Sequence, residues 1–583
     1  MSTELRRARN RQMVIFLLVC VGMVILSGRL YDWQVIHGPQ LARAADAEHI
    51  QNQTLNAPRG RIYDATGQLL ATNVVRDDVY IEPSQLVTDY PDTYQAERDA
   101  VIQKLSGVLT NIPLEKLKSA FDSSVPTVRV AISITPDQSQ KLKDLHLPYT
   151  FLEPRTWRTY PGGDLAAQVL GYVQEDASGG SPQGIYGVEK KYNTQLSGKA
   201  GSFTAETDLN GNPLTVGPSA EQDAVNGDDI TLTIDSTIQY QLQNELEARV
   251  KQMGAESGTA VVLNARTGAI VAMTGAPTFD PNNYSKYASD TGCRGQLEVY
   301  SNPALYCAYE PGSTMKAITM AAALDQHLIK PTDTIQDTGT LTFNDGTPPV
   351  ENWHNLGYGT ESMTQVLEHS ANVGAAWVVT QKLGSKGFYP YLQRFGFGQR
   401  TDVLDPESAG TYRTPDSKDW SPSDLARQSF GQSIQVTPLQ MASAYQAIAN
   451  GGTLMQPYLV SSLRDKDHTT TIQPHEERQV ISAEAAKTLG LMLESAANYN
   501  KEGVPGYRAA IKTGTATIQG LVDTNTDASM AGFLPVSNPQ FVILVKIDHP
   551  TATIYGGGAA GPVWREIAQQ LMWHYGIPPD AAG

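Results

Sequence analysis

The sequence predicts an α+β multidomain protein with a single N-terminal transmembrane helix, an α+β pedestal, and a larger C-terminal domain whose five-stranded antiparallel sheet is covered by helices. The chain has 583 residues, which is too long for one hydrophobic core. An uncharged apolar run from Met13 to Leu26 stands close to the N-terminus. Strand-like segments lie at both ends of the region from about residue 228 onward, with helical segments between them.

The N-terminal segment has the features of a membrane anchor. Residues 1–12 carry several arginines ahead of the apolar run, and we expect them to form a cytoplasmic tail. The anchor is predicted over residues 13–34. Its strict apolar run is shorter than the ~20 residues of an ideal span, but Leu30 extends it and Arg29 can snorkel to the interface. Residues beyond about 35 would then lie outside the cytoplasm.

A cleavable signal peptide is the alternative interpretation of this segment. Its alanine-x-alanine cleavage site would be Ala42-Arg43-Ala44, which lies farther from the apolar run than signal processing normally allows. The spacing therefore favours an uncleaved anchor.

Composition excludes several classes of function. The chain has 44 basic and 60 acidic residues and a formal net charge of −16, whereas nucleic-acid-binding proteins present a basic face. The same charge argues against broad docking on an anionic membrane surface. None of the three cysteines has metal-ligand spacing with histidines, so no zinc site is predicted. Cys293 and Cys307 would form a disulfide in an extracytoplasmic region, with two free thiols as the alternative.

Residues 35–235 are predicted to form a non-catalytic α+β pedestal. Ile62-Tyr63 and Gln68-Leu69-Leu70 are strand-like and flank a turn at residues 64–67. Apolar residues recur at helical spacing over 94–120 and 136–145. Neither paired carboxylates nor histidine clusters in this stretch indicate an active site.

Residues 236–583 form the predicted C-terminal domain. A hairpin is expected from 259–263 and 269–273, and three more strands at 509–517, 529–536 and 541–548. Helices are predicted at 237–252, 314–326, 362–369, 373–383, 437–450 and 563–574. Five strands split between the two ends of the domain imply one antiparallel sheet with helices on both faces. Residue 512 would then lie beside residue 313.

The first of three short motifs in this domain is Ser313-Thr-Met-Lys316. The serine stands at a helix start, where free backbone N–H groups favour developing negative charge, and the lysine follows one turn later on the same face. In a poorly solvated cleft, Lys316 would have a lowered pKa and can take the serine proton. For this motif alone, a capping serine followed by a surface lysine is the alternative.

The second motif, Ser370-Ala-Asn372, lies between two predicted helices. On a tight turn both polar side chains can project into one cleft, with Ser370 relaying a proton and Asn372 holding an acyl carbonyl and Lys316. The alternative is a pair of helix-capping residues.

The third motif, Lys512-Thr-Gly-Thr515, lies in a predicted strand. Thr513 and Thr515 face the same way and can bind a carboxylate, Gly514 leaves room for a substrate backbone, and Lys512 adds positive charge. The backbone N–H groups of Thr515 and Ser313 can form an oxyanion hole. A solvated edge strand is the alternative. In this order, the three motifs supply the parts needed for acyl transfer through a serine ester.

With these motifs, the chain resembles the class B penicillin-binding proteins, the monofunctional peptidoglycan D,D-transpeptidases, from its anchor to its C-terminal helix. One departure is Asn302-Pro303-Ala304, where the family usually has Asn-Arg-Ala, and together with the cysteine-flanked segment 290–307 it can reshape one rim of the cleft. Further segments that carry the resemblance are Arg59-Gly-Arg-Ile-Tyr-Asp64, Gly184-Ile-Tyr-Gly-Val-Glu-Lys-Lys-Tyr192, Tyr309-Glu-Pro-Gly312, Gly431 to Gln440, and Ala449-Asn-Gly-Gly452.

The resemblance implies a reaction and a role for each motif residue. The nucleophile Ser313 would attack the carbonyl between two terminal D-alanines of a peptidoglycan stem peptide, supplied on a lipid-linked precursor. An amine from a neighbouring stem would resolve the ester, and attack by water would give a carboxypeptidase side activity. β-Lactams would acylate the same serine, and the family needs no metal or organic cofactor. In the implied roles, Lys316 is the general base, Ser370 and Lys512 pass a proton to the leaving amine, Asn372 orients the acyl group, and Thr513 and Thr515 bind the terminal carboxylate.

The resemblance also implies a polytopic membrane glycosyltransferase as partner, within the division or the elongation machinery, and no nucleic acid. The compact pedestal and the absence of long insertions favour the division type over the elongation type. A serine β-lactamase or β-lactam sensor shares the motifs, but a secreted lactamase needs neither pedestal nor anchor, and a sensor needs a cytoplasmic signalling domain. The intact motifs disfavour a catalytically inactive scaffold. A bifunctional enzyme with a glycosyltransferase domain is disfavoured because residues 35–235 lack candidate catalytic carboxylates.

Overall fold

The computed structural model describes residues 3–41, 50–55, 57–175, 182–206, 219–295, 297–343, 348–517 and 525–581 of the 583-residue chain. It divides into two compact units. The first comprises residues 1–57 and 198–226, and the second comprises residues 58–197 and 227–583. The alternative cleavage site at Ala42 to Ala44 lies outside the described residues.

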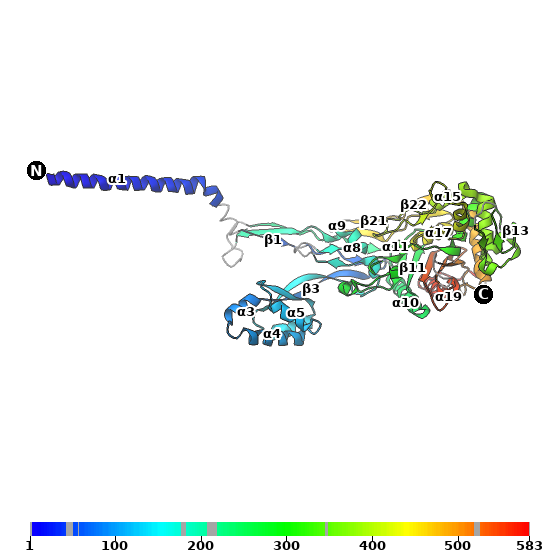
Figure 1. Ribbon diagram of the computed structural model, residues 1–583, viewed down its shortest axis with the longest axis horizontal. Helices are drawn as coiled ribbons and strands as arrows, with labels where there is room; N and C mark the ends of the chain where they lie inside the picture. Colours follow the sequence, from blue (N-terminus) through cyan, green and yellow to red (C-terminus); the bar gives the residue numbers. More distant parts are fainter. Residues whose placement is uncertain are drawn as a thin grey trace. The chain divides into compact units, whose positions relative to one another are not determined.

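The first unit contains a long helix and a small sheet. Helix α1 (Thr3–Tyr31), blue in Figure 1, continues into the π-helical turn η1 (Asp32–Ile36). The segment Arg7–Ile36 is long and apolar enough to cross a membrane, and its apolar side chains are exposed. No other described helix is as long and apolar, so the predicted single apolar helix at the N-terminus is confirmed. Strands β1 (Ile50–Leu55), β8 (Gly201–Glu206) and β9 (Ser219–Gln222) form an antiparallel sheet in that order.

A seven-stranded sheet runs through the first part of the second unit. Its order is β21-β20-β10-β2-β3-β4, with β5 paired to β3. The predicted hairpin around residues 62–70 is confirmed. Two strands of this sheet come from residues 460–471, so the sheet joins the pedestal sequence to the C-terminal domain. The strands are β2 (Ile62–Tyr63), β3 (Leu69–Ile81), β4 (Val128–Ile134), β5 (Thr150–Thr159), β10 (Asp229–Leu232), β20 (Val460–Arg464) and β21 (Thr469–Thr471).

Four helices form a separate hydrophobic core with β3 and β4. The sequence predicts helix over 94–120, whereas the structure has two helices with a break between them. Pro113 explains the break, because its ring nitrogen has no N–H to donate and its ring disfavours helical backbone at Ile112. Pro113 instead becomes the N-cap of the second helix. The four helices are α3 (Pro83–Asp89), α4 (Tyr94–Val108), α5 (Leu114–Phe121) and α6 (Pro136–Leu145).

A buried ionic cluster fixes the segments next to this sheet. Glu189 is fully buried and accepts hydrogen bonds from Arg59 Nε and Arg158 Nε, each at 2.7 Å. Arg59 also donates to the Glu189 carbonyl at 3.0 Å, and Arg158 donates to the Gly60 carbonyl at 2.7 Å. Because buried charges are tolerated only when they are paired and hydrogen-bonded, the sequence motifs around Arg59 and Glu189 have a structural role.

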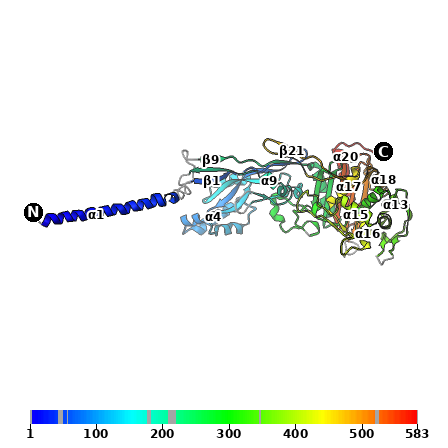
Figure 2. The same ribbon diagram turned by 90° about the horizontal axis from the view of Figure 1, so that it is seen from above.

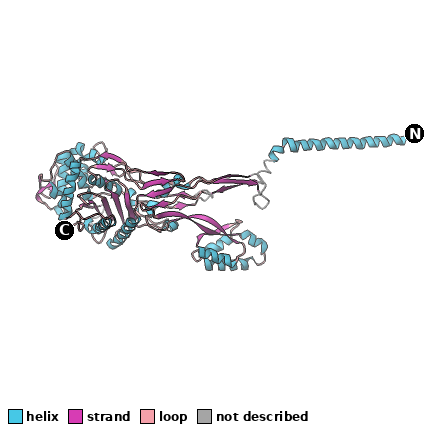
Figure 3. Ribbon diagram, turned by 180° about the vertical axis from the view of Figure 1, so that it is seen from behind, coloured by secondary structure: helices cyan, strands magenta, loops and turns pink. Residues whose placement is uncertain are grey.

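The five predicted strands of the C-terminal domain form one antiparallel sheet. Ile543 and Val545 belong to the core on one face of the sheet, under α10 (Ser236–Met253) and α20 (Gly561–His574). Val542 and Leu544 belong to the core on the other face, under α12 (Lys316–Asp325), α17 (Pro438–Ala449) and α18 (Ala483–Tyr499). Figure 2 and Figure 3 show helices crowding around these strands. The prediction of a helix-covered, five-stranded sheet is therefore confirmed. The strand order is β12 (Ile270–Ala276), β11 (Ser257–Asn264), β25 (Phe541–Asp548), β24 (Thr526–Leu534) and β23 (Ala510–Thr517).

Shorter elements connect the two sheets and surround the motifs. The helices are α7 (Ala167–Leu170), α8 (Gly187–Lys191), α9 (Asn193–Ser197), α11 (Pro303–Tyr306), α13 (Met363–Glu368), α14 (Asn372–Trp377), α15 (Gly384–Arg394), α16 (Pro422–Gln428) and α19 (Gly556–Ala559). The 3-10 turns are η2 (Pro281–Tyr287), η3 (Cys293–Gly295), η4 (Gly312–Met315) and η5 (Trp353–Asn355), and η6 (Val378–Leu383) is a π-helix. The paired strands are β6 (Val173–Gln174) with β7 (Gln183–Gly184), β13 (Thr334–Asp337) with β16 (Gly359–Ser362), β14 (Thr340–Leu341) with β15 (Val350–Glu351), β17 (Thr411–Tyr412) with β18 (Ile434–Gln435), and β19 (Thr453–Met455) with β22 (Glu476–Gln479).

Several predicted elements differ from the observed ones, mainly at their ends, and the second half of the predicted helix 373–383 is the π-helix η6. The predicted helix 314–326 begins with the 3-10 turn η4, so regular α-helix starts only at Lys316. The predicted strand 529–536 is β24, which ends at Leu534 because Pro535 has no N–H to donate to a neighbouring strand.

Candidate active site

Ser313 stands in the tight turn that precedes α12. Gly312, just before it, has a φ of 56°, and its N–H donates to the Gly431 carbonyl at 3.0 Å. A Cβ on Gly312 would lie only 3.0 Å from the Thr515 carbonyl oxygen. Glycine at this position therefore allows the Ser313 turn to pack directly on strand β23, while the Ser313 side chain stays half-buried.

Lys316 is the first residue of α12 and is completely buried. Its Nζ lies 2.9 Å from Ser313 Oγ and 2.8 Å from Asn372 Oδ1. It also donates to the Ser370 carbonyl and lies 3.3 Å from Ser370 Oγ. Burial, and secondarily the positive charge of Lys512, lower the pKa of Lys316 well below its usual value. The site therefore favours a neutral amine beside a serine hydroxyl, which is the arrangement a general base requires.

The second motif forms the turn between α13 and α14. Ser370 has a φ of 56°, a left-handed conformation that is unusual for serine. This conformation turns both its carbonyl and its hydroxyl toward Lys316. Asn372 accepts from Lys316 through Oδ1 and donates through Nδ2 to the Glu351 carbonyl at 3.0 Å. Its amide is therefore oriented from two sides.

The third motif lies on β23, the edge strand of the five-stranded sheet. Thr513 and Thr515 are half-exposed on one face of the strand, while Gly514 between them is buried. A Cβ on Gly514 would lie 2.5 Å from Ser529 Oγ and 2.7 Å from the Pro311 carbonyl oxygen. The absence of a side chain at Gly514 thus makes room for Ser529 and Pro311. The predicted close approach of a substrate backbone to Gly514 stays a prediction.

Lys512 is buried on the opposite face of β23 from the two threonines. Its Nζ donates to the Thr513 carbonyl at 3.1 Å, and burial lowers its pKa to about 8, against the opposing effect of Glu502. A small cavity beside it is lined by Asn500, Glu502, Thr513 and neighbouring residues. The structure thus joins Ser313, Lys316, Ser370 and Asn372 by direct contacts, whereas Lys512 acts on Lys316 through its charge.

Sequence reasoning missed the polar groups behind the second motif. Asp337, Asn352 and Glu361 are buried, and the Oδ1 atom of Asn352 accepts from the Val373 N–H at 3.0 Å. These residues belong to no short motif, and tertiary contacts alone bring them to this loop.

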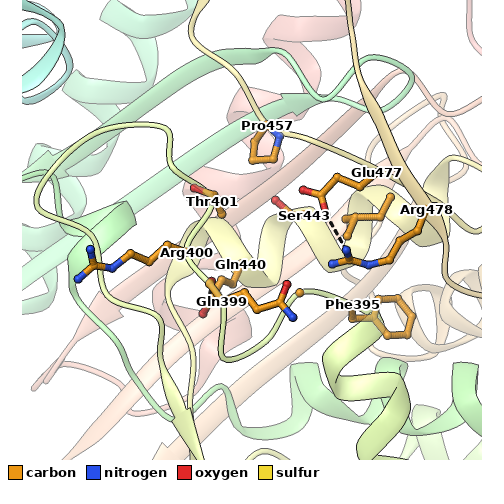
Figure 4. Close-up of a pocket in the computed structure, with 11 residues that line it drawn as sticks. Phe395, Gln399, Arg400, Thr401, Gln440, Ser443, Pro457, Glu477 and Arg478 are labelled. Atoms are coloured by element: carbon orange, nitrogen blue, oxygen red, sulfur yellow. Dashed lines mark hydrogen bonds and ion pairs between the residues drawn. The ribbon is translucent and has the colours of Figure 1, made fainter. Parts of the chain in front are cut away.

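A second depression in this domain contains none of the motif residues (Figure 4). Its wall includes Phe395, Gln399 and Arg400 together with Arg478, which pairs with Glu477 at 3.0 Å. The chemistry of the three motifs therefore lies elsewhere.

The segment that precedes Ser313 contains Cys293 and Cys307, for which the sequence left open either a disulfide or two free thiols. Cys293 and Cys307 form a disulfide with a Cα–Cα distance of 6.0 Å. Asn302 caps α11 by accepting from the Ala304 N–H at 3.0 Å, and Pro303 occupies the first helical position, where no N–H is needed.

Two family models match the chain. The penicillin binding protein transpeptidase domain matches residues 258–569, and the penicillin-binding protein dimerisation domain matches residues 54–232. The first match contains all three motifs.

Known proteins resemble the chain over nearly its whole length. Stage V sporulation protein D of Bacillus subtilis (strain 168) is 30% identical, and the match covers 98% of this chain and 86% of that protein. Peptidoglycan D,D-transpeptidase FtsI of Escherichia coli (strain K12) is 29% identical, with coverage of 97% and 92%. The crystal structure of penicillin-binding protein 3 from Mycobacterium tuberculosis, complexed with aztreonam, superposes with a TM-score of 0.67 at 26% identity and covers 91% of this chain and 98% of that one.

Proposed function

The chain belongs to the class B penicillin-binding proteins and is a peptidoglycan D,D-transpeptidase, and on this premise we propose that Ser313 is the nucleophile that forms its acyl-enzyme. The observation that carries this proposal is the 2.9 Å contact between Ser313 Oγ and the buried Nζ of Lys316. A buried amine with a lowered pKa can accept the hydroxyl proton at the moment the oxygen attacks.

In the first half of the proposed reaction, Ser313 attacks the carbonyl between the two terminal D-alanines. The Oγ–H bond breaks, its proton moves to Lys316 Nζ, and a new Oγ–C bond forms. The negative charge on the former carbonyl oxygen is held by the backbone N–H groups of Ser313 and Thr515. The close packing of Gly312 against Thr515 supports this assignment, because it brings the two backbone segments together.

Collapse of this intermediate breaks the C–N bond and releases D-alanine. The leaving nitrogen takes up a proton that passes from Lys316 through Ser370, with Lys512 stabilising the transfer. Ser370 Oγ, at 3.3 Å from Lys316 Nζ, is in position to begin that relay. Asn372 orients the acyl group, and its two fixed hydrogen bonds support this role.

The substrate's terminal carboxylate is proposed to bind Thr513 and Thr515, with Lys512 adding positive charge from the opposite face of β23. Both threonine side chains are half-exposed on the same face of β23, which supports a shared ligand. Gly514 belongs to the same proposed subsite. An amine from a neighbouring stem then attacks the ester carbon and loses a proton to Lys316 as the new C–N bond forms. The C–Oγ bond breaks, and Ser313 Oγ takes that proton from Lys316 Nζ, which restores both residues.

The division of the chain and its setting in the membrane follow as proposals. The apolar N-terminal helix is consistent with a single-pass membrane protein. We assign residues 1–12 to a cytoplasmic tail, 13–34 to the anchor, 35–235 to the pedestal and 236–583 to the transpeptidase domain, with the catalytic domain outside the cytoplasm. Arginines ahead of the apolar run support this orientation.

A polytopic membrane glycosyltransferase that elongates glycan strands is the proposed partner, bound through the anchor and pedestal. Relatives named FtsI support a role in division, together with the compact pedestal. The elongation type remains the alternative.

Labelling with a fluorescent penicillin tests the assignment of Ser313. The intact protein should form a stable covalent adduct that is absent in Ser313→Ala. Ser443→Ala is the matched control, because this buried serine lies in the depression of Figure 4, away from the motifs, and its hydroxyl has no hydrogen-bond partner among the described residues. Equal labelling of wild type and Ser313→Ala would refute the assignment, and rapid turnover of the adduct would favour a β-lactamase.

A further inference from the structure

Two acidic residues lie buried directly behind the second motif. Asp337 ends β13 and Glu361 lies in the neighbouring strand β16, and each side chain is about 1% exposed. Strands β13 and β16 are paired, and both residues point to the same buried face of that pair, so their carboxyl groups face one another. Two negative charges this close in a buried site repel strongly, which favours a proton on one of the two groups.

The surrounding hydrogen bonds identify which group holds that proton. Asp337 accepts from the Gly339 N–H and from Asn352 Nδ2, each at 2.7 Å. Glu361 Oε2 lies 2.9 Å from His369 Nδ1, while Oε1 has no N–H or O–H donor among the described residues. Burial, followed by the interaction with Asp337, raises the pKa of Glu361 to about 8. Glu361 is therefore the protonated member at neutral pH.

The pair contacts both ends of the loop that contains Ser370 and Asn372. Glu361 bonds to His369, the residue before Ser370. Asp337 holds Asn352, whose Oδ1 accepts from the N–H of Val373, the residue after Asn372. Because Ser370 adopts a left-handed backbone, the loop needs such support from both sides to present its carbonyl and hydroxyl to Lys316.

Charge connects the same pair to Lys316. The negative charge of an ionised Glu361 would raise the pKa of Lys316, which burial and Lys512 lower. While Glu361 holds its proton, it carries no negative charge that would stabilise the protonated form of Lys316.

We propose that Asp337 and Glu361 are a proton-sharing positioning pair, which holds the Ser370–Asn372 loop from both sides and keeps Lys316 free of a facing negative charge. The proposal rests on the roles proposed above for Ser313 and Lys316. Neither acid touches the reacting atoms, so both act through the loop and through Lys316.

Other titratable groups also face this pair and enter its pH dependence. Tyr358 stacks on His369 at 4.4 Å between ring centroids, and Tyr499 from α18 meets the same ring edge-on at 5.4 Å. Burial raises the pKa of Tyr358, so it stays neutral in the relevant range. On the other side, Lys316 from α12 faces Glu361, and Lys512 from β23 faces Lys316.

The test is the pH dependence of penicillin acylation in two variants, across roughly pH 5 to 9. In Asp337→Asn, the new amide can donate to Glu361, which then ionises at neutral pH and raises the pKa of Lys316. The acid limb of the pH profile of the second-order acylation rate constant should therefore move to higher pH by about one unit. Glu361→Gln keeps a neutral donor toward Asp337, so its acid limb should stay where the wild type has it.

Glu407→Gln is the matched control, since Glu407 is a buried carboxyl that accepts from the Thr401 N–H far from the motifs. An unmoved acid limb in Asp337→Asn, or an equal loss of rate at every pH in both variants, overturns the proposal. A shifted limb in Asp337→Asn alone supports it. Persistent labelling of Ser313→Ala would instead refute the proposed function, so the two failures are distinguishable.

Infrared spectroscopy of the wild-type protein gives a test that does not depend on how a variant folds. A carbonyl stretch from a buried, protonated carboxyl group should be present at neutral pH and should disappear as the pH rises through about 8. The same band should be missing from Glu361→Gln. Absence of the band in the wild type overturns the proposal.

Discussion

Lys316 and Lys546 are both fully buried, and of the two only Lys546 has a carboxylate partner within the part of the chain that the structure describes. Lys546 pairs with Asp548, which also accepts from Ser257 Oγ at 2.6 Å. The contacts of Lys316 are hydroxyl, amide and carbonyl oxygens. Without an adjacent carboxylate, a buried ammonium group is poorly stabilised. Lys316 therefore favours its neutral form, which can act as a base. Burial therefore serves reactivity at Lys316 and structure at Lys546.

Lys316→Met should reduce penicillin acylation by about 100-fold or more, because the general base is lost while the chain length at this position is kept. Stability should change little, since Ser370 and Asn372 are half-exposed and can bond water in place of the amine. Stopped-flow acylation and the thermal unfolding midpoint measure the two effects.

Lys546→Met is the matched control for this prediction. It leaves the carboxylate of Asp548 buried without its cation, which should cost about 3–5 kcal/mol of unfolding free energy. Its folded fraction should still acylate at a rate near that of the wild type. Normal acylation by Lys316→Met, or an equal loss of acylation in both variants, would contradict the assignment of Lys316 as the general base and of Lys546 as a structural residue.

At the scale of elements, apolar runs bounded by turn residues predicted the five strands well. The strand at residues 541–548 has the same bounds in the structure as in the prediction, because its run of buried apolar residues is flanked by turn residues. The end of helix α4 was missed although Pro113 signals it, since apolar residues continue at helical spacing across the break. Local patterns thus predict an element's type better than its ends.

Contacts behind the site could not be predicted from such patterns. The left-handed backbone of Ser370 has no local signal such as glycine, and it is held by groups from β13, from β16 and from Asn352, the residue before η5. Asp337 and Glu361 look like ordinary polar residues of short strands in the sequence. Only the fold shows that they face one another. The three motifs could therefore be predicted from the sequence, but the residues that position the second motif could not.

Gly514→Ala should displace the edge strand that carries the third motif. The new Cβ would lie 2.5 Å from Ser529 Oγ and 2.7 Å from the Pro311 carbonyl oxygen. Because the Pro311 oxygen belongs to the backbone, this clash is relieved only if β23 shifts away from it. We expect a loss of about 1–3 kcal/mol in stability. Acylation should fall more than that loss explains, because Thr513 and Thr515 move with the strand.

Gly490→Ala in α18 is the control, since its Cβ would meet Phe533 at an ordinary 3.5 Å and alanine favours a helix. Urea unfolding and the acylation rate constant are the measurements. Normal acylation of Gly514→Ala would mean that the strand accommodates a side chain at this point.

At the scale of the whole second unit, the pedestal sequence is tied to the transpeptidase domain by shared sheet and by buried side chains. Gln168, from α7, accepts from the Gly275 N–H at 2.9 Å and donates to the Val299 carbonyl at 3.0 Å. Strand β20 of the C-terminal domain pairs with β10 at the end of the pedestal sequence. Damage to the pedestal core should therefore lower the stability of the entire unit, although the catalytic residues are untouched.

Glu189→Gln tests this coupling, because it removes the carboxylate that pairs with both Arg59 and Arg158. Those two guanidinium groups are 8% and 5% exposed, so they would stay buried without an anion, at a cost of about 3–5 kcal/mol. Glu477→Gln is the control, as its pair with Arg478 is about one-third exposed and is worth only about 0–1 kcal/mol. Urea unfolding of Glu189→Gln should shift as one transition for the whole unit, with acylation by penicillin unchanged under folding conditions. Two separate transitions, with only one shifted, would show that the pedestal and the transpeptidase domain unfold independently.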